Sequence, residues 1–478
     1  MEPGIEGCEP LCSRFWKLTL MQSILDRLVK VSPVPAMVRI ALENILSPEH
    51  LDGIFRSTAA IQTQRQLLFS SIVELMCLVV CRIKPSVNAA YVHLEELLDV
   101  SVKSVYNKIN KVEPEVSRQL VCQTSERVQA VIDELGVFND SPIPGYDVRI
   151  LDGNHHPASE HRLAILRDVA AAPLPGLSLV VFDPVRGIVV DCVPCEDGHK
   201  QERALVPEVL NDVEAGTVWI ADRNFCTCSF MFELALHNAY FVVRRHAVTH
   251  IEVQDFAVPC GSVETGTVTE QVADVVDANG QRLRCRLITL HLHQPTRDGD
   301  QYIQILTNLP SDVSALVVAE SYRSRWKIEN VNLELVKHFD SEQTSLGNPP
   351  ATLFAFCVSI VAFNVLQLVH ASLRAAHGEA ATKDKVSNYY LAHALQAGWE
   401  STYMIDEEFW IQQYSQATPK QLAYELTRIA KGVRLSQFRK SKRGPKKPTT
   451  PRTRFQGTPH ISTYKLLNNI TETEDSNA

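Results

Sequence analysis

The sequence predicts an α/β domain built on a mixed sheet, split by a β-rich insertion and flanked by helical regions. Three observations predict this fold class. Apolar residues recur at helical spacing through most of residues 15–137. From residue 148, short runs of Val, Ile and Leu alternate with helical segments, which is typical of an α/β sheet. Between residues 250 and 310, apolar and Thr-rich runs are separated by the hairpin turns Asn279-Gly280 and Asp298-Gly299.

Changes in this pattern divide the chain into six segments. A turn-rich stretch at 139–145 (NDSPIPG) predicts the first boundary. We expect a helical region at 1–140, the first part of the α/β domain at 146–249, the β-rich insertion at 250–310, the rest of the α/β domain at 311–375, a helical region at 386–440 and a basic tail at 441–478. The tail is rich in Pro, Thr and Lys, so we expect it to lack stable structure until it meets a partner.

Charge is distributed unevenly along the chain. The net charge of −8 argues against nucleic-acid binding by the chain as a whole. Residues 431–454, however, carry ten Lys and Arg and no Asp or Glu, and this segment includes Lys440, Lys442, Arg443, Lys446 and Lys447. Such a segment in an acidic chain indicates a local contact with nucleic acid, although it could also serve only solubility. The 12 Cys are scattered and no secretory signal is visible, so we expect reduced thiols in a cytoplasmic protein.

The helical N-terminal region contains a predicted helix-turn-helix, with one helix at 87–98 and the second at 102–112. Lys103, Asn107 and Lys108 fall on faces of the second helix that we expect to be exposed, where they could meet phosphates and base edges. The alternative is an all-α core module whose exposed helix is polar.

Residues 351–373 contain no charged residue and are long enough to span a bilayer. Asn364, Gln367 and His370 recur on one side of this segment, which favours a buried core helix. We therefore expect no membrane partner.

Two aspartates directly follow apolar runs that predict strands. Asp152 follows the run at 148–151 (RILDGN), and Asp222 follows the run at 218–221 (WIADRNF). Sites form at strand ends in α/β sheets, and carboxylates there can bind hard cations such as Mg²⁺. Either aspartate could instead be a turn residue.

A third carboxylate, Glu329, lies in a long helix predicted at 314–339. Tyr322, Arg325 and Glu329 are spaced three and then four residues apart, so they share one helix face. A guanidinium grips phosphate through paired hydrogen bonds, and a carboxylate one turn later can bind a metal that acts on that phosphate. Two such metals can make hydroxide from water and stabilise the leaving oxygen of a phosphodiester.

These motifs resemble a DDE transposase of the insertion-sequence-four family. The resemblance is carried by ILDGN with EHRL a little later, by ADRNF, and by the Tyr-x-x-Arg-x-x-x-Glu signature at Tyr322, Arg325 and Glu329. It covers roughly residues 148–364 and implies a ribonuclease H-like catalytic domain. One departure concerns the Lys that ends the signature, since Val336 stands there and Lys337 is displaced by ~100° around the helix.

The resemblance implies cleavage at transposon ends and joining of the 3′-hydroxyls to target DNA. Asp152, Asp222 and Glu329 would hold two Mg²⁺ or Mn²⁺ ions, with no small-molecule cofactor. DNA phosphates would be bound by Tyr322, Arg325, Lys337 and Arg223. The partners implied are double-stranded DNA and a second copy of the chain in the DNA complex, on the nucleoid within the cytoplasm.

Two rival functions stay open: a structure-specific nuclease on the same fold, and a non-catalytic helix-turn-helix protein derived from a transposase. Other residues have plainer interpretations. Trp219 and Trp326 are expected to pack in the core, and the three histidines near Asp152 are expected on the surface: His155, His156 and His161. Cys192, Cys195 and His199 have zinc-like spacing, but Cys192 lies in a strand pattern, where alternate residues point to opposite faces.

Overall fold

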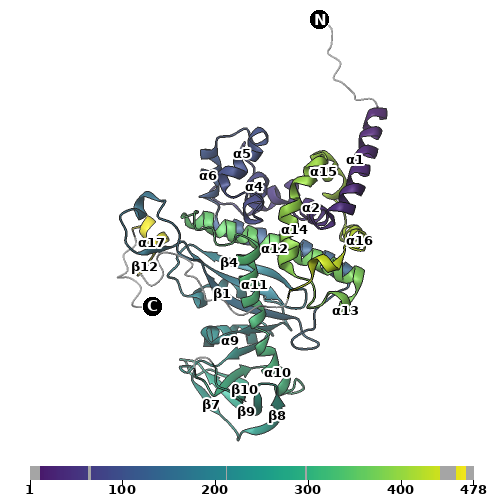
Figure 1. Ribbon diagram of the computed structural model, residues 1–478. Helices are drawn as coiled ribbons and strands as arrows, with labels where there is room; N and C mark the ends of the chain where they lie inside the picture. Colours follow the sequence, from purple (N-terminus) through teal and green to yellow (C-terminus); the bar gives the residue numbers. More distant parts are fainter. Residues whose placement is uncertain (1–10, 63–65, 212, 297–298, 442–458, 470–478) are drawn as a thin grey trace.

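One ten-stranded sheet forms the centre of the computed structural model, which describes residues 11–62, 66–211, 213–296, 299–441 and 459–469 (Figure 1). Its strands are β1 (Val148–His155), β3 (Leu177–Asp183), β4 (Ile188–Cys195), β5 (Val218–Ala221), β6 (Tyr240–Arg244), β7 (Ile251–Val253), β8 (Val258–Val263), β9 (Gly266–Val276), β10 (Arg282–Leu292) and β11 (Tyr302–Thr307). The order is β4-β3-β1-β5-β6-β11-β10-β9-β7, and β8 pairs with β9.

The predicted mixed sheet with helices is confirmed. β1, β5 and β6 are parallel, whereas β3 and β4 join as antiparallel neighbours. Parallel strands need crossover connections. Here these are α8 (Val206–Leu210) before β5 and α9 (Cys228–Leu236) before β6. The parallel strands therefore place their carboxyl ends at one edge of the sheet.

The strands of the predicted β-rich insertion extend the sheet without a break, because β11 pairs with β6. β7 ends at Val253 and β8 begins at Val258, because Asp255 turns the chain by accepting a hydrogen bond from the Val272 amide at 2.8 Å.

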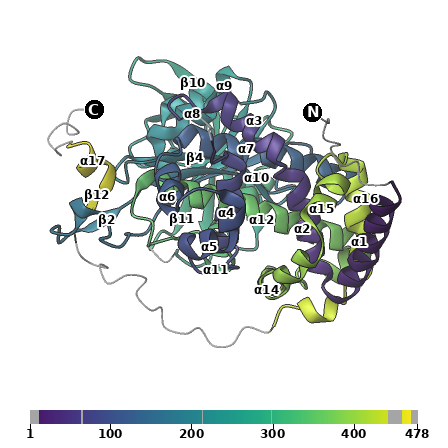
Figure 2. The same ribbon diagram turned by 90° about the horizontal axis from the view of Figure 1, so that it is seen from above.

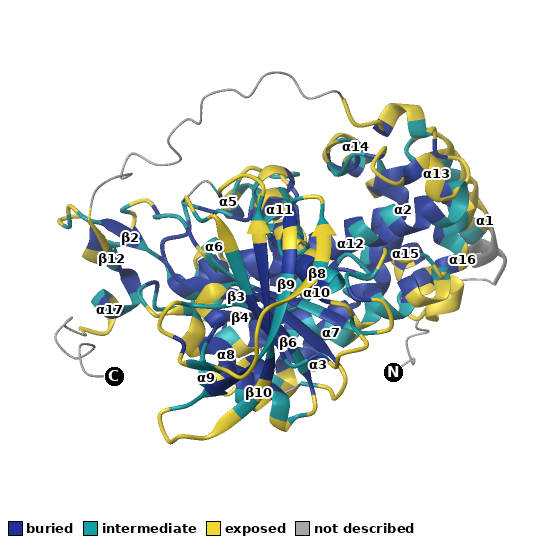
Figure 3. Cartoon of the chain, turned by 90° about the horizontal axis from the view of Figure 1, so that it is seen from below, coloured by how far each residue is buried: buried dark blue, intermediate teal, exposed yellow. Residues whose placement is uncertain are grey.

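Helices cover both faces of the sheet. Alternate residues of β3 enter two separate cores: Val180 and Phe182 join one, and Leu179 and Val181 join the other. The first core packs under α7 (Pro114–Leu135) and α12 (Pro349–His377), and the second under α8 and α9. β3 and β5 are consequently buried along their whole length, whereas β8 is largely exposed (Figure 3).

α12 is the only helix of the described residues long and apolar enough to cross a membrane, and 94% of its most apolar window is buried inside the protein. This burial agrees with the core helix predicted from Asn364. That side chain accepts a hydrogen bond from the Val189 amide at 2.9 Å and donates one to the Val189 carbonyl at 2.7 Å. It thus satisfies backbone groups of β4, which is the outermost strand at one end of the sheet order.

Replacing Asn364 by Ala is expected to destabilise the protein by about 3 kcal/mol, because two buried backbone groups of Val189 lose their partner. Urea denaturation measures this loss. Gln367→Ala, on the same helix but only half-buried, is the control and should change stability little. A loss below about 1 kcal/mol for Asn364→Ala would show that water replaces the side chain.

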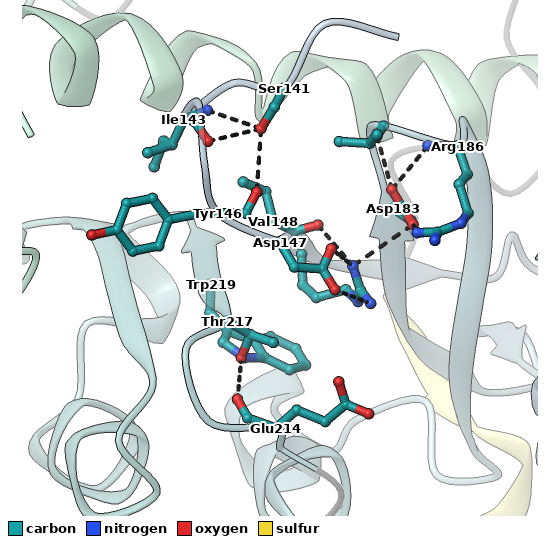
Figure 4. Close-up of polar contacts among 12 residues, drawn as sticks. Ser141, Ile143, Tyr146, Asp147, Val148, Asp183, Arg186, Glu214, Thr217 and Trp219 are labelled. Carbon is teal, nitrogen blue, oxygen red and sulfur yellow. Dashed lines mark hydrogen bonds and ion pairs between the residues drawn. The ribbon is translucent and has the colours of Figure 1, made fainter. Parts of the chain in front are cut away.

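The start of β1, ~13 Å along the strand from Asp152, is held by a polar network (Figure 4). Arg149 pairs with Asp147 at 2.8 Å and lies 3.7 Å from the fully buried Asp183. Asp183 also pairs with Arg186 at 2.9 Å. Because a buried carboxylate needs such partners, this network ties β1 to the turn between β3 and β4.

Helices from both ends of the chain pack together beside the sheet (Figure 2). They are α1 (Leu11–Val31), α2 (Pro33–Ile45), α14 (Asn388–Gly398), α15 (Glu407–Tyr414) and α16 (Pro419–Ala430). Arg39 of α2 links them, since it pairs with Glu43 at 3.1 Å and with Glu407 of α15. The predicted N-terminal and C-terminal helical segments therefore contact each other directly. Three further helices contact α7 or α12: α3 (Pro48–Thr58), α4 (Phe69–Val80) and α13 (Glu379–Thr382).

The structure places helices α5 (Val87–Leu98) and α6 (Val102–Ile109) where the helix-turn-helix is predicted. Ser101 caps α6 by accepting a hydrogen bond from the Ser104 amide. Lys103 and Asn107 are exposed. The expectation for Lys108 is wrong, because its ammonium lies 4.1 Å from the centre of the Phe55 ring and the side chain is half-buried.

Part of the predicted tail has structure. β12 (His460–Ser462) pairs in parallel with β2 (Ala172–Leu174), and α17 (Thr463–Leu467) follows. This differs from the expectation of a tail without stable structure, because the segment adds a strand to an available edge. Lys442, Arg443, Lys446 and Lys447 lie outside the described residues, whereas Lys440 is described and exposed.

Candidate catalytic site

Asp152 and Asp222 lie side by side at the edge where the parallel strands end. Leu151 of β1 pairs with Ala221 of β5, so the two following residues occupy matching positions on neighbouring strands. Such strands are about 4.8 Å apart. One detail differs from the sequence prediction, since β1 continues to His155 and Asp152 lies within the strand, opposite Val180 of β3.

The carboxylate of Asp222 is oriented by its own backbone. Asp222 caps the short helix η3 (Arg223–Phe225), and its carboxylate accepts a hydrogen bond from the Asn224 amide at 2.8 Å. This turn holds the carboxylate at the strand end, close to Asp152.

Glu329 reaches the same place from α11 (Trp326–His338). The single long helix predicted at 314–339 is wrong, because α10 (Ala315–Arg323) ends just before α11 begins. The chain passes between them in a tight helical turn, in which the Arg325 amide bonds to the Tyr322 carbonyl. Tyr322, Arg325 and Glu329 consequently still face one another, as their spacing predicts.

Arg325 links two of the three acids. Its guanidinium lies 2.8 Å from Glu329 and 3.8 Å from Asp152. Within the part of the chain that the structure describes, the buried Nε of Arg325 has no hydrogen-bond partner. The guanidinium therefore balances the negative charge of the cluster but leaves one of its own donors unused.

Crowding of buried carboxylates changes their proton affinity. The pKa of Asp152 is raised to about 7, mainly by burial; the charge of Arg325 lowers it, and the charges of Asp222, Glu202 and Glu329 raise it. Burial also raises the pKa of Asp222, while the hydrogen bond from Asn224 lowers it. At this edge a cation would be favoured, since it stabilises the ionised form of both groups.

The donor set fits a hard divalent cation, because carboxylate oxygens are the ligands that Mg²⁺ and Mn²⁺ prefer. Among the described residues, however, no three His, Cys, Asp or Glu side chains are already arranged around a single metal position. Arg325 occupies part of the space between Asp152 and Glu329. A cation held by these carboxylates would take over contacts that Arg325 now makes.

In the DNA cleavage that the resemblance implies, replacing Arg325 by Lys is expected to slow the reaction about fivefold at pH 7. A single ammonium cannot contact both acids, so the pKa of Asp152 rises; a rise of about one unit from about 7 lowers its ionised fraction at pH 7 about fivefold. The acid limb of the pH–rate profile should move to higher pH. Arg323→Lys, which alters an exposed pair with Glu264, is the matched control. An unchanged profile for Arg325→Lys would contradict this role for the guanidinium.

The other predicted phosphate ligands lie at different distances from the acids. Tyr322 lies beside Arg325; burial raises the pKa of its hydroxyl, and Arg325 lowers it. Arg223 follows Asp222 directly and is exposed. Lys337 is also exposed but lies about 12 Å along the helix from Glu329, so the structure does not bring it to the cluster.

Some plainer interpretations also need correction. Trp219 is buried as expected, but Trp326 is 63% exposed and its ring lies beside the Arg325 guanidinium. His156 is buried rather than on the surface, bonded to the Ser178 hydroxyl at 2.9 Å, and burial lowers its pKa to about 3. His155, by contrast, is half-exposed and lies 3.3 Å from Glu202.

Glu202 is a site residue that the sequence analysis missed. It lies in the short helix η2 (Glu202–Leu205), and its carboxylate is one of the charges that raise the pKa of Asp152. No apolar run or motif precedes it. The one signal was Gly153, whose lack of a side chain leaves room for this carboxylate.

Residues 144–364 match the family model of the transposase DDE domain. That stretch begins shortly before β1, ends within α12 and contains the two aspartates and Glu329. The match supports a transposase DDE domain in this chain. The search of curated proteins finds no match. Among solved structures, the chain is similar to a piggyBac transposase in a synaptic complex with hairpin DNA, with 9% identity over 89% of this chain and 88% of that chain. At its TM-score of 0.36, that likeness bears on neither fold nor function.

Proposed function

We propose that this chain is a DDE transposase of the insertion-sequence-four type, which cleaves DNA at transposon ends and joins the 3′-hydroxyls to target DNA. One observation carries the proposal: three carboxylates far apart in sequence lie at one sheet edge, within the segment that matches the transposase DDE domain. The order of the first five strands, β4-β3-β1-β5-β6, supports a ribonuclease H-like arrangement for this domain.

In this proposal Asp152, Asp222 and Glu329 hold two Mg²⁺ or Mn²⁺ ions. When bound, these ions supply a hydroxide nucleophile and stabilise the leaving oxygen of the phosphodiester. Arg325 and Tyr322 bind the phosphate beside the acids, because they lie closest to them. Arg223 binds phosphate farther along the DNA, and so does Lys337, which lies two helical turns from Glu329.

DNA contacts extend beyond the acids. The exposed Lys103 and Asn107 of α6 are placed to meet a duplex, and the basic segment from Lys440 onward adds phosphate contacts. Two transposon ends must be paired, so we propose that a homodimer forms on DNA. The protein would act in the cytoplasm, on the nucleoid.

The test is cleavage of duplexes that carry the DNA flanking its own gene, with and without Mg²⁺. A transposase nicks at the outer ends of that DNA and joins the freed 3′-hydroxyl to a second duplex. Cutting that depends on branched structure and yields no joined product would identify a nuclease instead. Sequence-specific binding without any cutting in Mg²⁺ or Mn²⁺ would identify a non-catalytic DNA-binding protein.

A further inference from the structure

A glycine is needed at position 153, next to Asp152, because a side chain there would collide with Glu202. Its backbone conformation does not require glycine. Its φ is not in the left-handed region that favours glycine. A Cβ built at this position would instead lie 2.1 Å from Cδ and 2.2 Å from Oε1 of Glu202. The carboxylate of Glu202 therefore rests directly on the backbone of β1, and any larger residue at 153 would displace it.

Glu202 also reaches the strand that carries the second aspartate. One carboxylate oxygen accepts a hydrogen bond from the Asn224 side chain at 3.1 Å, and the other lies 3.3 Å from Nε2 of His155. The backbone amide of Asn224 in turn donates to Asp222 at 2.8 Å. A continuous set of contacts thus runs from β1 through Glu202 to the turn of Asp222.

The burial of Glu202 makes this bridge rigid. Its side chain is 14% exposed, and it is held from two sides by hydrogen-bonding partners and from below by Gly153. Carboxylates that bind one metal pair must be held within about 0.5 Å of their working positions. Asp152 and Asp222 repel each other when both are ionised, and the contacts of Glu202 add to the pairing of β1 with β5 in resisting that repulsion before a cation binds.

We propose that Glu202 is a positioning residue, which fixes the separation of the Asp152 and Asp222 carboxylates by clamping the two strand ends together. This inference rests on the proposed function, since the separation matters because the two aspartates bind metal. Glu202 acts through its shape and hydrogen bonds, so an amide at this position should serve nearly as well as the carboxylate.

The experiment compares Mn²⁺ binding to the full chain, by calorimetry in the absence of DNA, in four variants and the wild type. Glu202→Ala and Gly153→Ala should weaken Mn²⁺ binding by about 10- to 100-fold, because each removes the clamp. Glu202→Gln should stay within about threefold of the wild type, since Gln keeps an oxygen for Asn224. Glu208→Gln, an exposed acid on the neighbouring helix α8, is the matched control and should leave binding unchanged.

A double variant separates the clamp from a general disturbance of β1. If Gly153→Ala acts by expelling Glu202, then Gly153→Ala combined with Glu202→Ala should bind Mn²⁺ no more weakly than Glu202→Ala alone. Circular dichroism confirms that each variant folds, and Glu202→Ala keeps the test valid if Gly153→Ala does not.

Two results would contradict the proposal that Glu202 positions the Asp152 and Asp222 carboxylates. Unchanged binding in Glu202→Ala would show that the carboxylate has no part in the site. Equal losses in Glu202→Gln and Glu202→Ala would show that its charge matters, as in a direct metal ligand. If the wild type itself binds no Mn²⁺, the proposed metal-dependent function fails, and that outcome is distinct from both.

Discussion

Replacing Asp152, Asp222 or Glu329 by its amide is expected to slow Mg²⁺-dependent nicking by about 1,000-fold or more. Each amide keeps the shape of the side chain but removes a charged oxygen ligand. A metal ion contributes several kcal/mol to such a reaction, and each 1.4 kcal/mol corresponds to about tenfold in rate. Affinity for the DNA ends should change little, because binding depends on basic residues elsewhere on the protein.

The measurement is single-turnover nicking of an end-containing duplex, with DNA affinity followed separately by fluorescence anisotropy. Glu320→Gln on α10 is the control, since Glu320 is an exposed acid on the helix just before Glu329. If all three amide variants lost DNA binding or failed to fold, the acids would be structural. If one of them nicked at the wild-type rate, that residue would be excluded from the catalytic set.

The acids of this site could be named from the sequence because each lies near a strong local pattern. Asp152 and Asp222 each follow a short apolar run. The parallel pairing of β1 with β5 then brings the two residues close together. Glu329 could be named because Arg325 and Tyr322 precede it at helical spacing. The break between α10 and α11 hardly disturbed that inference, since the connecting turn keeps a helical course.

Other features depend on contacts between segments that are far apart in the sequence, so no local sequence pattern predicts them. The extension of the sheet rests on β11 pairing with β6, about 60 residues apart in sequence, so the sequence of the β-rich insertion does not show that it continues the sheet. Lys108 lies over Phe55, and His156 is buried against Ser178 and Phe356; neither partner is a sequence neighbour. Glu202 could not be predicted for the same reason, because three strands separate it from β1 along the chain.

The Asp152 carboxylate should make the metal-free protein less stable at high pH, and Asp152→Asn should reverse this. Its pKa is about 7 in the folded protein against an ordinary value of 3.8. The folded state therefore holds a proton that the unfolded state has already lost. Stability contributed by this group is fully present below about pH 4 and is lost as pH rises towards 7. That difference corresponds to up to about 4 kcal/mol at pH 8.

Urea denaturation in the presence of a chelator measures this effect for the wild type and Asp152→Asn. The variant should be more stable by up to about 4 kcal/mol at pH 8 and by less than half of that at pH 5. Glu208→Gln, an exposed acid, should show no such dependence on pH. Equal stability of wild type and Asp152→Asn at both pH values would show that the carboxylate is ionised and well solvated.

Added Mg²⁺ should remove the disadvantage of the wild type. A ligand that binds only the folded state raises its stability with concentration, and a cation at this edge stabilises the ionised Asp152 that burial penalises. The Asn variant lacks that ligand, so Mg²⁺ should stabilise it much less. The empty site therefore lowers the stability of the folded protein, and a bound cation restores it. This is expected where buried acids serve to bind metal rather than to stabilise the fold. Equal stabilisation of both proteins by Mg²⁺ would place the cation elsewhere.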